Sequence, residues 1–370
     1  MQWCKDIRQG IVLSIILCGM GLSIANTRMC KSLRRVGLSG IVWIVSNHKE
    51  REMEYINEKE KIAIYHTDCV ELAKSLPDNS IDFSVYSPPF ANLYTYSDNL
   101  ADMGNCANEE EFFKQYAYLI KEKFRITANG RLTAIHCKDL PKYKNRDGAG
   151  GLVDFAGAII KAHEECGWTY HSRITIWKDP VIEMQRTKNQ GLLYKQVCKD
   201  SAYSRQGMAD YIIVMRKCDY SDNTPVCREG GERFYDYIGS SYFAPKIEKG
   251  ALARDEEELK RLYSIAVWQR YASPVWFDIS QTNVLNTALA KDGKDEKHIC
   301  PLQLDVIERC IELWSNEGEI VFSPFMGIGS EGYQAVLQNR GFIGSELKEG
   351  YFQIALSNIK KALDTKRSLF

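Results

Sequence analysis

The stretch Asp82-Phe83-Ser84-Val85-Tyr86-Ser87-Pro88-Pro89-Phe90 is an alternating apolar run that ends abruptly in Ser-Pro-Pro-aromatic. Because two consecutive prolines cannot donate to a sheet ladder, the run predicts a β-strand that stops at Ser87. In open α/β sheets, ligands bind at the carboxyl ends of the strands. There the serine hydroxyl and the proline carbonyls can accept hydrogen bonds from an exocyclic NH2 group, and Phe90 can stack on its ring. Taken alone, the same residues also suit an ordinary Pro-Pro turn with a buried phenylalanine.

A second pattern lies far later in the chain and is typical of nucleotide binding. Its predicted elements are a strand at 318–322, a glycine-rich turn at 323–332, a helix at 333–339 and a strand at 341–344. Glycines let the backbone approach a ligand closely, and a helix N-terminus favours polar or negative groups. Glu346 follows the last strand, where its carboxylate can accept hydrogen bonds from ribose hydroxyls. Gly327, Gly329 and Gly332 also match G-x-G-x-x-G, so an NAD-dependent oxidoreductase is an alternative.

Together, the two patterns resemble the amino-group DNA methyltransferases that use S-adenosylmethionine. The resemblance extends from about Lys61 to about Lys361 with a variable middle. The stretches that carry it are 82–90, 321–330, 342–348, 297–303 and Thr67-Asp68-Cys69 with the Leu-Pro-Asp turn that follows. The catalytic loop precedes the cofactor loop, as in the permuted beta order of that family, and the details are closest to phage-borne and prophage-borne methylases.

The resemblance implies an α/β fold with a mostly parallel, Rossmann-like methyltransferase sheet, a circularly permuted motif order and an inserted target-recognition region. In that sheet the two loop-bearing strands are neighbours. The implied activity is site-specific transfer of a methyl group from S-adenosylmethionine to the exocyclic amine of a flipped base in double-stranded DNA. A serine at the start of the Ser-Pro-Pro loop is commoner among cytosine-N4 methylases than among adenine-N6 methylases, which favours cytosine.

The family's functional residues map onto two sets of positions. The implied catalytic residues are Ser87, Pro88, Pro89 and Phe90. The implied cofactor-binding residues are Asp68, Ser323, Phe325, Gly327, Gly329, Glu346, His298 and Gln303. Asp68 also suits a plain helix N-cap, and His298 also suits a surface histidine. The family's cofactor motif usually begins with Asp-Pro-Phe, and Ser323 cannot supply that carboxylate. A catalytically inactive DNA-binding homologue is therefore a second alternative.

The charge pattern places DNA contacts in one segment. Lysine and arginine balance aspartate and glutamate at 48 each, so any polyanion binding depends on local basic patches. Residues 183–207 combine basic and aromatic side chains, a composition that suits phosphate contact and base stacking. The predicted DNA-binding residues are Arg186, Lys188, Lys195, Lys199 and Arg205. An ordinary solvated insertion is the alternative for this segment.

The 12 cysteines are scattered singly, with no C-x-x-C pair and no Cys/His cluster at zinc spacing. The sequence therefore predicts no metal site, and it favours free thiols in a reducing cytoplasm. No membrane partner is expected, and the sequence does not indicate an oligomeric state.

The chain divides into four predicted regions. Residues 1–52 contain an apolar run at 11–25, which is short for a membrane span and also suits a signal-peptide core. The favoured interpretation is a non-essential leader, with the functional protein beginning near Met53. Residues 53–217 form the catalytic half with the basic insertion at 183–207. Residues 218–297 form a variable insertion suited to target recognition, and residues 298–370 form the cofactor-binding half.

Overall fold

The computed structural model describes residues 53–89, 102–142, 144–187, 194, 198, 200, 206–218, 256–285 and 301–368. The predicted leader at residues 1–52 lies outside these ranges, as does most of the predicted variable insertion. Several predicted site residues also lie outside them: Phe90, His298, Lys188, Lys195, Lys199 and Arg205.

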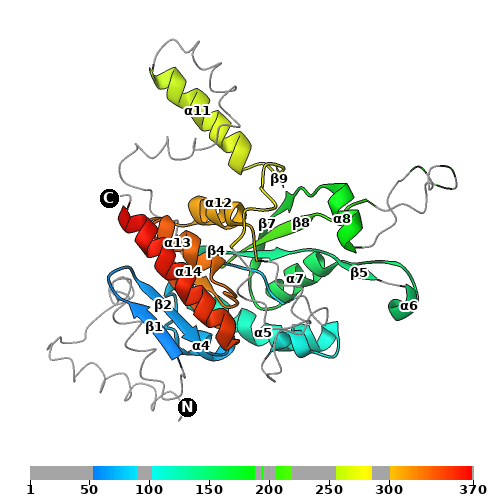
Figure 1. Cartoon of the computed structure of the whole chain (residues 1–370), viewed down its shortest axis with the longest axis horizontal. Coiled ribbons are helices and arrows are strands. Elements are labelled where there is room, and N and C mark those ends of the chain that lie inside the picture. The colour runs from blue at the N-terminus through cyan, green and yellow to red at the C-terminus, as the bar shows by residue number, and fades with distance from the viewer. Residues whose placement is uncertain are drawn as a thin grey trace. The chain divides into compact units, whose positions relative to one another are not determined.

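Nine strands of the described part of the chain form one sheet, in the order β1-β2-β11-β10-β3-β4-β8-β7-β9 (Figure 1). Their bounds are β1 Met53–Asn57, β2 Ile62–His66, β3 Ile81–Tyr86, β4 Thr127–Cys137, β7 Thr169–Ile176, β8 Asp210–Arg216, β9 Val275–Trp276, β10 Ile320–Ser323 and β11 Gly341–Glu346. The five central strands from β2 to β4 are parallel, whereas β1 and β8 run antiparallel to their neighbours. Two short strands, β5 Leu140–Lys142 and β6 Gly151–Val153, form a separate antiparallel pair.

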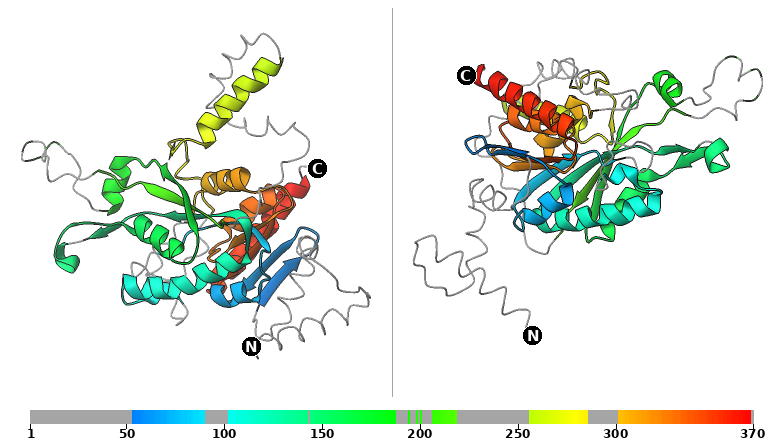
Figure 2. Two further views of the ribbon diagram at one scale, coloured as in Figure 1. Left: turned by 180° about the vertical axis from the view of Figure 1, so that it is seen from behind. Right: turned by 60° about the horizontal axis from the view of Figure 1, so that its bottom comes forward.

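Helices cover both faces of this sheet, as the right-hand view of Figure 2 shows. On one face lie α4 Cys69–Ser75, α5 Glu109–Ile126 and α7 Phe155–Glu164, and on the other lie α12 Leu304–Trp314, α13 Ser330–Leu337 and α14 Glu349–Ser368. The remaining helices are η3 Met103–Asn105, α6 Lys144–Asp147, α8 Pro180–Thr187 and α11 Glu256–Tyr271. No helix among the described residues is long and apolar enough to cross a membrane.

The strands alternate between two buried clusters. In β2, Ala63 and Tyr65 pack in the cluster with α4, α5 and α7, whereas Ile62 and Ile64 pack with α12, α13 and α14. Because both faces are covered, the central strands carry buried apolar side chains on both faces. The mostly parallel, doubly covered α/β sheet that the sequence implies is thereby confirmed.

The decisive pairing for the site is that of β3 with β10. The two strands are parallel neighbours, with Phe83 opposite Val321 and Ser84 opposite Phe322. Their carboxyl ends therefore release the loop that begins at Ser87 and the glycine-rich turn that follows Ser323 at the same edge. The expectation that the two loop-bearing strands are neighbours is confirmed, although they are far apart in the sequence.

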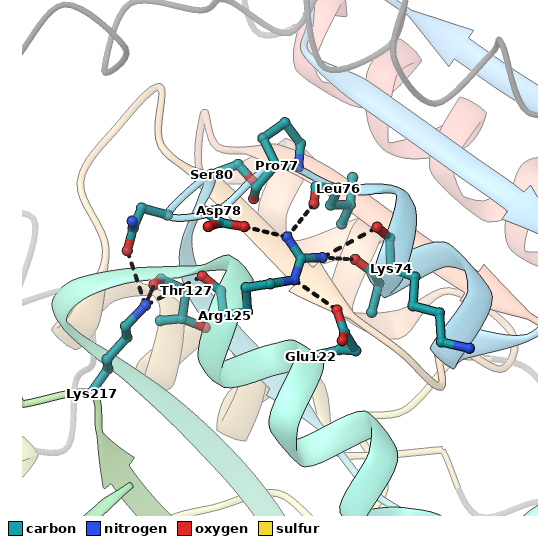
Figure 3. Close-up of polar contacts among 11 residues, drawn as sticks. Lys74, Leu76, Pro77, Asp78, Ser80, Glu122, Arg125, Thr127 and Lys217 are labelled. Atoms are coloured by element: carbon teal, nitrogen blue, oxygen red, sulfur yellow. Dashed lines mark hydrogen bonds and ion pairs between the residues drawn. The ribbon is translucent and has the colours of Figure 1, made fainter. Parts of the chain in front are cut away.

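Two basic side chains close the carboxyl ends of α4 and α5 at the opposite edge of the sheet (Figure 3). The Arg125 guanidinium donates to three carbonyls at the end of α4, those of Ala73, Lys74 and Leu76. The Lys217 ammonium donates to two carbonyls at the end of α5, those of Arg125 and Thr127. The last carbonyls of a helix have no partner within the helix, so these cations satisfy them and also complement the helix dipoles.

Two predicted boundaries are wrong, and both errors have a tertiary cause. The sequence of residues 151–166 predicts one helix, but β6 occupies the first three because it pairs with β5, and α7 begins after Asp154, whose side chain accepts from the Gly157 amide. The Asn129-Gly130 pair predicts the end of the preceding helix. They lie instead within β4, where the Gly130 amide donates to the Lys217 carbonyl.

Candidate active site

Ser87 lies directly after β3, at the carboxyl edge of the sheet, and is partly buried. Its Oγ lies 2.8 Å from Nδ1 of His136, the penultimate residue of β4. Pro88 is buried and Pro89 is partly buried, so the hydroxyl is presented by a rigid turn. The strand that was predicted to stop at Ser87 does so, because β3 ends at Tyr86.

The contact between Ser87 and His136 continues to two buried charged side chains, Asp210 and Lys178. His136 Nε2 lies 3.2 Å from Oδ2 of Asp210, the first residue of β8. The same oxygen lies 2.6 Å from Nζ of Lys178, which follows β7. Burial acts to raise the pKa of Asp210, but the hydrogen bond from His136 and the Lys178 cation outweigh it and hold this pKa well below its usual range. Asp210 is therefore an anion.

The chain of contacts reaches the helix that precedes the cofactor turn. Lys178 Nζ donates to Oε1 of Gln281, and Gln303 Nε2 lies 3.4 Å from the same oxygen. Gln303 is the residue before α12 and was predicted to contact the cofactor. The structure places it at the far end of a polar path that begins at Ser87.

A buried network fixes the strand just before Ser87. Tyr86 Oη lies 2.6 Å from Tyr116 Oη and 2.6 Å from Nζ of Lys123, which is fully buried. Lys123 also donates to Oγ1 of Thr133 in β4. Burial lowers the pKa of Lys123 well below its ordinary value. The residue before the Ser-Pro-Pro turn is thus tied to α5 and to β4, which leaves the turn little freedom to move.

The second loop runs from β10 into α13. Ser323 ends β10 with its side chain fully buried, and its Oγ has no hydrogen-bond partner among the described residues. Gly327 has φ +51°, and among the described residues no atom beyond its chain neighbours lies within 4 Å of the position that a Cβ would take there. One side of the turn is therefore open beside its backbone, as close approach of a ligand requires.

Two carboxyl groups flank this turn, the partly buried Glu346 and the buried Glu331. Glu346, at the end of β11, accepts hydrogen bonds from the Gly327 amide through Oε2 and from the Lys348 amide through Oε1, both at 2.9 Å. Burial raises its pKa to about 7. Burial, with the charge of Glu346 as a smaller contribution, raises the pKa of Glu331 at the start of α13 to about 8.

Two further predicted cofactor residues lie at this edge. Asp68 caps α4, because its Oδ1 accepts from the amides of Val70 and Glu71. The partly buried Phe325 ring lies 5.9 Å from the Tyr86 ring, which joins the cofactor turn to the strand that carries Ser87. Arg186 lies in α8 on a separate element.

The sequence predictions missed three residues of the site: His136, Lys178 and Asp210. His136 could have been found from the sequence. Residues 131–136 predict a strand, and His136 is its last residue, at the ligand-binding edge. Asp210 gave no such signal, because it begins an antiparallel strand and meets His136 only through the β4–β8 pairing. Within the described residues, no group of three or more His, Cys, Asp or Glu side chains is arranged to hold a metal ion.

Comparison with known proteins gives one consistent result. Residues 81–357 match the family described as DNA methylase, with the family name N6_N4_Mtase. The orphan methyltransferase M.BamHII of Bacillus amyloliquefaciens is 51% identical over 289 residues, which cover 78% of this chain and 92% of that protein. The type II methyltransferase M.BglI of Bacillus subtilis is 21% identical over 347 residues, which cover 81% of this chain and 86% of that protein.

Two solved structures share the fold. The TTHA0409 protein of Thermus thermophilus, in complex with S-adenosyl-L-methionine, has a TM-score of 0.52 at 19% identity and covers 81% of this chain and 93% of its own. The PvuII cytosine-N4-specific DNA methyltransferase has a TM-score of 0.50 at 15% identity and covers 83% of this chain and 92% of its own.

Proposed function

The chain belongs to the DNA methylase family of N6 and N4 amino-methyltransferases, and we propose that it methylates the N4 amine of a cytosine flipped out of double-stranded DNA. The family assignment makes the chain a DNA amino-methyltransferase that uses S-adenosylmethionine. The choice of cytosine over adenine is supported by Ser87 at the start of the Ser-Pro-Pro loop, a position where cytosine-N4 methylases more often carry serine.

The observation that carries this function is the adjacency of β3 and β10. Methyl transfer to an amine needs the acceptor nitrogen and the methyl donor in line and in contact. One strand of this pair ends in Ser87 and the other ends in the glycine-rich turn. The pair therefore supports a target base over the first loop and a cofactor over the second, side by side at one edge.

The residues of the second loop fit S-adenosylmethionine. Each Glu346 oxygen accepts one backbone amide, and a carboxylate oxygen has two lone-pair directions, so acceptor capacity remains for ribose hydroxyls. The open side of Gly327 leaves room for the ligand beside this carboxylate. Burial raises the pKa values of Glu346 and Glu331, and a cationic ligand beside them would favour their ionised forms, which supports a sulfonium cofactor here. When bound, the cofactor supplies a methyl group on a sulfonium ion.

The residues of the first loop suit an aromatic amine. The lone pair of such an amine is delocalised into its ring, so hydrogen bonds that hold its NH2 group favour a more tetrahedral, more nucleophilic nitrogen. In this proposal the Ser87 hydroxyl, directly after β3, and the carbonyl of the Pro88 turn accept those bonds. Phe90 stacks on the flipped ring in this proposal. In duplex DNA, base flipping costs roughly a few kcal/mol.

DNA binding is assigned to the basic set Arg186, Lys188, Lys195, Lys199 and Arg205, with base recognition in residues 218–297. We place the enzyme in the cytoplasm, where DNA is accessible and where the free thiols of the described cysteines are stable. M.BglI is a type II methyltransferase and M.BamHII an orphan methyltransferase, so a role in restriction-modification or in solitary DNA modification suits this chain as well.

Neither alternative from the sequence is favoured. An NAD-dependent oxidoreductase leaves the Ser87 loop without a role, and the family match runs through both loops. An inactive homologue was suggested by Ser323, whose buried hydroxyl replaces the usual carboxylate. The two alternatives differ from the proposal in what the protein binds and what it transfers.

The test is methyl transfer from labelled S-adenosylmethionine to duplex DNA, followed by digestion to nucleosides. We expect N4-methylcytosine in wild-type protein, and we expect Ser87→Ala to lose most of the label while S-adenosylmethionine affinity stays unchanged by calorimetry. N6-methyladenine would correct the target base. Tight binding of both DNA and cofactor without any transfer would identify an inactive homologue, and binding of NAD in place of S-adenosylmethionine would identify an oxidoreductase.

A further inference from the structure

Ser87, His136 and Asp210 belong to three neighbouring strands and form one polar chain. In the parallel β3–β4 pair, Tyr86 lies opposite Ile135, so the residues that follow each of them meet at the carboxyl edge. The antiparallel β8 begins at the same edge with Asp210. His136 and Asp210 are 8% and 5% exposed, so their contacts are shielded from bulk water.

The charge on Asp210 orients this set of contacts, in which Ser87 and His136 share a hydrogen bond and His136 Nε2 makes an ion-pair contact with Asp210. An ionised carboxylate only accepts, and the Lys178 cation at 2.6 Å keeps Asp210 ionised. His136 therefore carries its proton on Nε2, 3.2 Å from Asp210, and presents an unprotonated Nδ1. The Ser87 hydroxyl, 2.8 Å away, must then donate its hydrogen to that nitrogen. The lone pairs of Ser87 Oγ remain for a donor from the substrate.

We propose that His136 and Asp210 hold the Ser87 hydroxyl as an acceptor for the target amine and take up the proton that this amine gives up. The proposal deepens the proposed function and rests on it, since an amine must occupy the Ser87 loop. His136 acts through Ser87 and is a positioning residue. Asp210 fixes the imidazole tautomer and balances the positive charge that the imidazole acquires.

The proton balance is complete within these three residues. As the nitrogen–methyl bond forms and the methyl–sulfur bond of the donor breaks, the target nitrogen becomes positively charged and must lose a proton. That proton passes to Ser87 Oγ while the Ser87 hydrogen moves to His136 Nδ1, which leaves the hydroxyl unchanged. The imidazole ends as a cation beside the Asp210 carboxylate, and it returns the proton to water after the products leave.

The arrangement also predicts which bases are accepted. A base that brings a carbonyl oxygen to Ser87 would face the lone pairs of a hydroxyl whose only hydrogen is already donated. Sites built to pair with an N–H group reject analogues that lack it by large factors, because polar groups are left unpaired. The polar contacts from Ser87 to Asp210 therefore select amino bases without themselves touching the rest of the ring.

Other charged groups near the imidazole are already paired with one another. Lys178 lies on the far side of Asp210, where it also contacts Gln281. Lys138, two residues after His136, lies 3.6 Å from Glu183 of α8, measured from Nζ to Oε2. Of the two ring nitrogens of His136, Nδ1 faces Ser87 and Nε2 faces Asp210, so the proposed proton path runs through this imidazole.

The test compares His136→Asn with His171→Asn, a matched change at an exposed histidine of β7. The amide of His136→Asn can still accept from Ser87 but cannot take up a proton. We expect the single-turnover methylation rate of His136→Asn to fall by about 10²–10⁴-fold. Its calorimetric S-adenosylmethionine affinity and its DNA affinity should stay within twofold of wild type. His171→Asn should match wild type throughout.

A second readout needs no turnover. In wild-type protein with nitrogen-15-labelled histidine, nuclear magnetic resonance should show the His136 proton on Nε2 at neutral pH, and Asp210→Asn should weaken that preference. A proton on Nδ1, or a His136→Asn variant that methylates at the full rate, would overturn the proposal. If His136→Asn does not fold, the proposal is tested by the His136 tautomer in wild-type protein and by the methylation rate of Asp210→Asn. Wild-type protein that transfers no methyl group would instead refute the proposed function, whatever the tautomer.

Discussion

Gly329 packs directly against Ala355 of α14: a Cβ atom at position 329 would lie 3.0 Å from both the Cα and the Cβ atom of Ala355. Gly329 also has φ +85°, which L side chains rarely adopt. Gly327, two residues earlier, has open space where its Cβ would lie. Two glycines of one turn therefore have different purposes. Gly329 allows the turn to pack on α14, and we propose that Gly327 leaves room for the cofactor.

The first prediction separates these two purposes. Gly329→Ala should destabilise the fold by about 1–3 kcal/mol, because it combines backbone strain with a close contact to α14. Gly327→Ala should cost about 1 kcal/mol of strain but reduce S-adenosylmethionine affinity at least tenfold. Urea unfolding and calorimetry on both variants provide the comparison. The assignment is wrong if Gly329→Ala is as stable as wild type, or if Gly327→Ala binds the cofactor normally.

The second prediction concerns pH and Glu331. Its pKa of about 8 in the folded protein lies above the ordinary value of 4.5, so the folded state holds a proton that the unfolded chain releases. Stability from this group is present at low pH and is lost as pH rises from about 4.5 to 8. Glu331→Gln should remove on the order of 3 kcal/mol of this decline in cofactor-free protein. Glu349→Gln, at the exposed start of α14, is the control and should follow the wild-type curve. If the free energy of unfolding falls with pH equally in Glu331→Gln and in wild type, the raised pKa is wrongly assigned to Glu331.

The third prediction concerns the helix ends in Figure 3. Arg125→Met should lower the free energy of unfolding by about 2 kcal/mol, because the three carbonyls at the end of α4 lose a charged donor. Lys74→Ala removes only an exposed ion pair with Glu71 and should change stability by less than about 0.5 kcal/mol. If both changes lower the free energy of unfolding equally in urea, the contacts of Arg125 with the end of α4 do not stabilise the fold more than an exposed ion pair does.

The fourth prediction concerns the basic segment. Replacing Lys195 and Lys199 with alanine should weaken DNA binding on all sequences and lower the salt slope by roughly one unit for each phosphate that the variant no longer neutralises. Single-turnover methylation at saturating DNA should be unchanged, since neither residue has a proposed role in the reaction itself. Lys161→Ala on the exposed side of α7 is the matched control. If the slope stays the same, residues 183–207 are a solvated insertion, and the DNA contacts must be sought in residues 218–297.

The fifth prediction concerns the proposed boundary at Met53. A chain that begins at Met53 retains β1, which pairs with β2 from Met53 opposite His66. Every residue proposed to contact the base, the cofactor or DNA lies after it. We expect this shortened chain to fold and to methylate DNA at the full rate. A loss of folding or of turnover would show that residues before Met53 belong to the domain.

Sequence reasoning succeeded where local chemistry dictates the structure. Pro88 and Pro89 cannot extend a ladder, so β3 had to end before them, and β3 ends at Tyr86. Asp68 stands at a strand-to-helix junction, and it caps α4 there. Glu346 follows a strand after a glycine-rich turn, and its carboxylate closes that turn through the Gly327 amide. Each of these results depends on neighbours in the sequence.

Tertiary structure alone decided the features that depend on distant pairing. Residues 151–153 form a strand because they pair with β5, and Asn129 and Gly130 lie in β4 because its edge meets Lys217. Gly329 faces α14 only because that helix crosses the turn. His136 and Asp210 meet through an antiparallel strand pair, and no local pattern encodes the register of such a pair. The sequence by itself determined the two loops and the chemistry they suit, whereas the order of strands in the sheet brought Ser87, His136 and Asp210 into one line, because register is set by packing across the whole sheet.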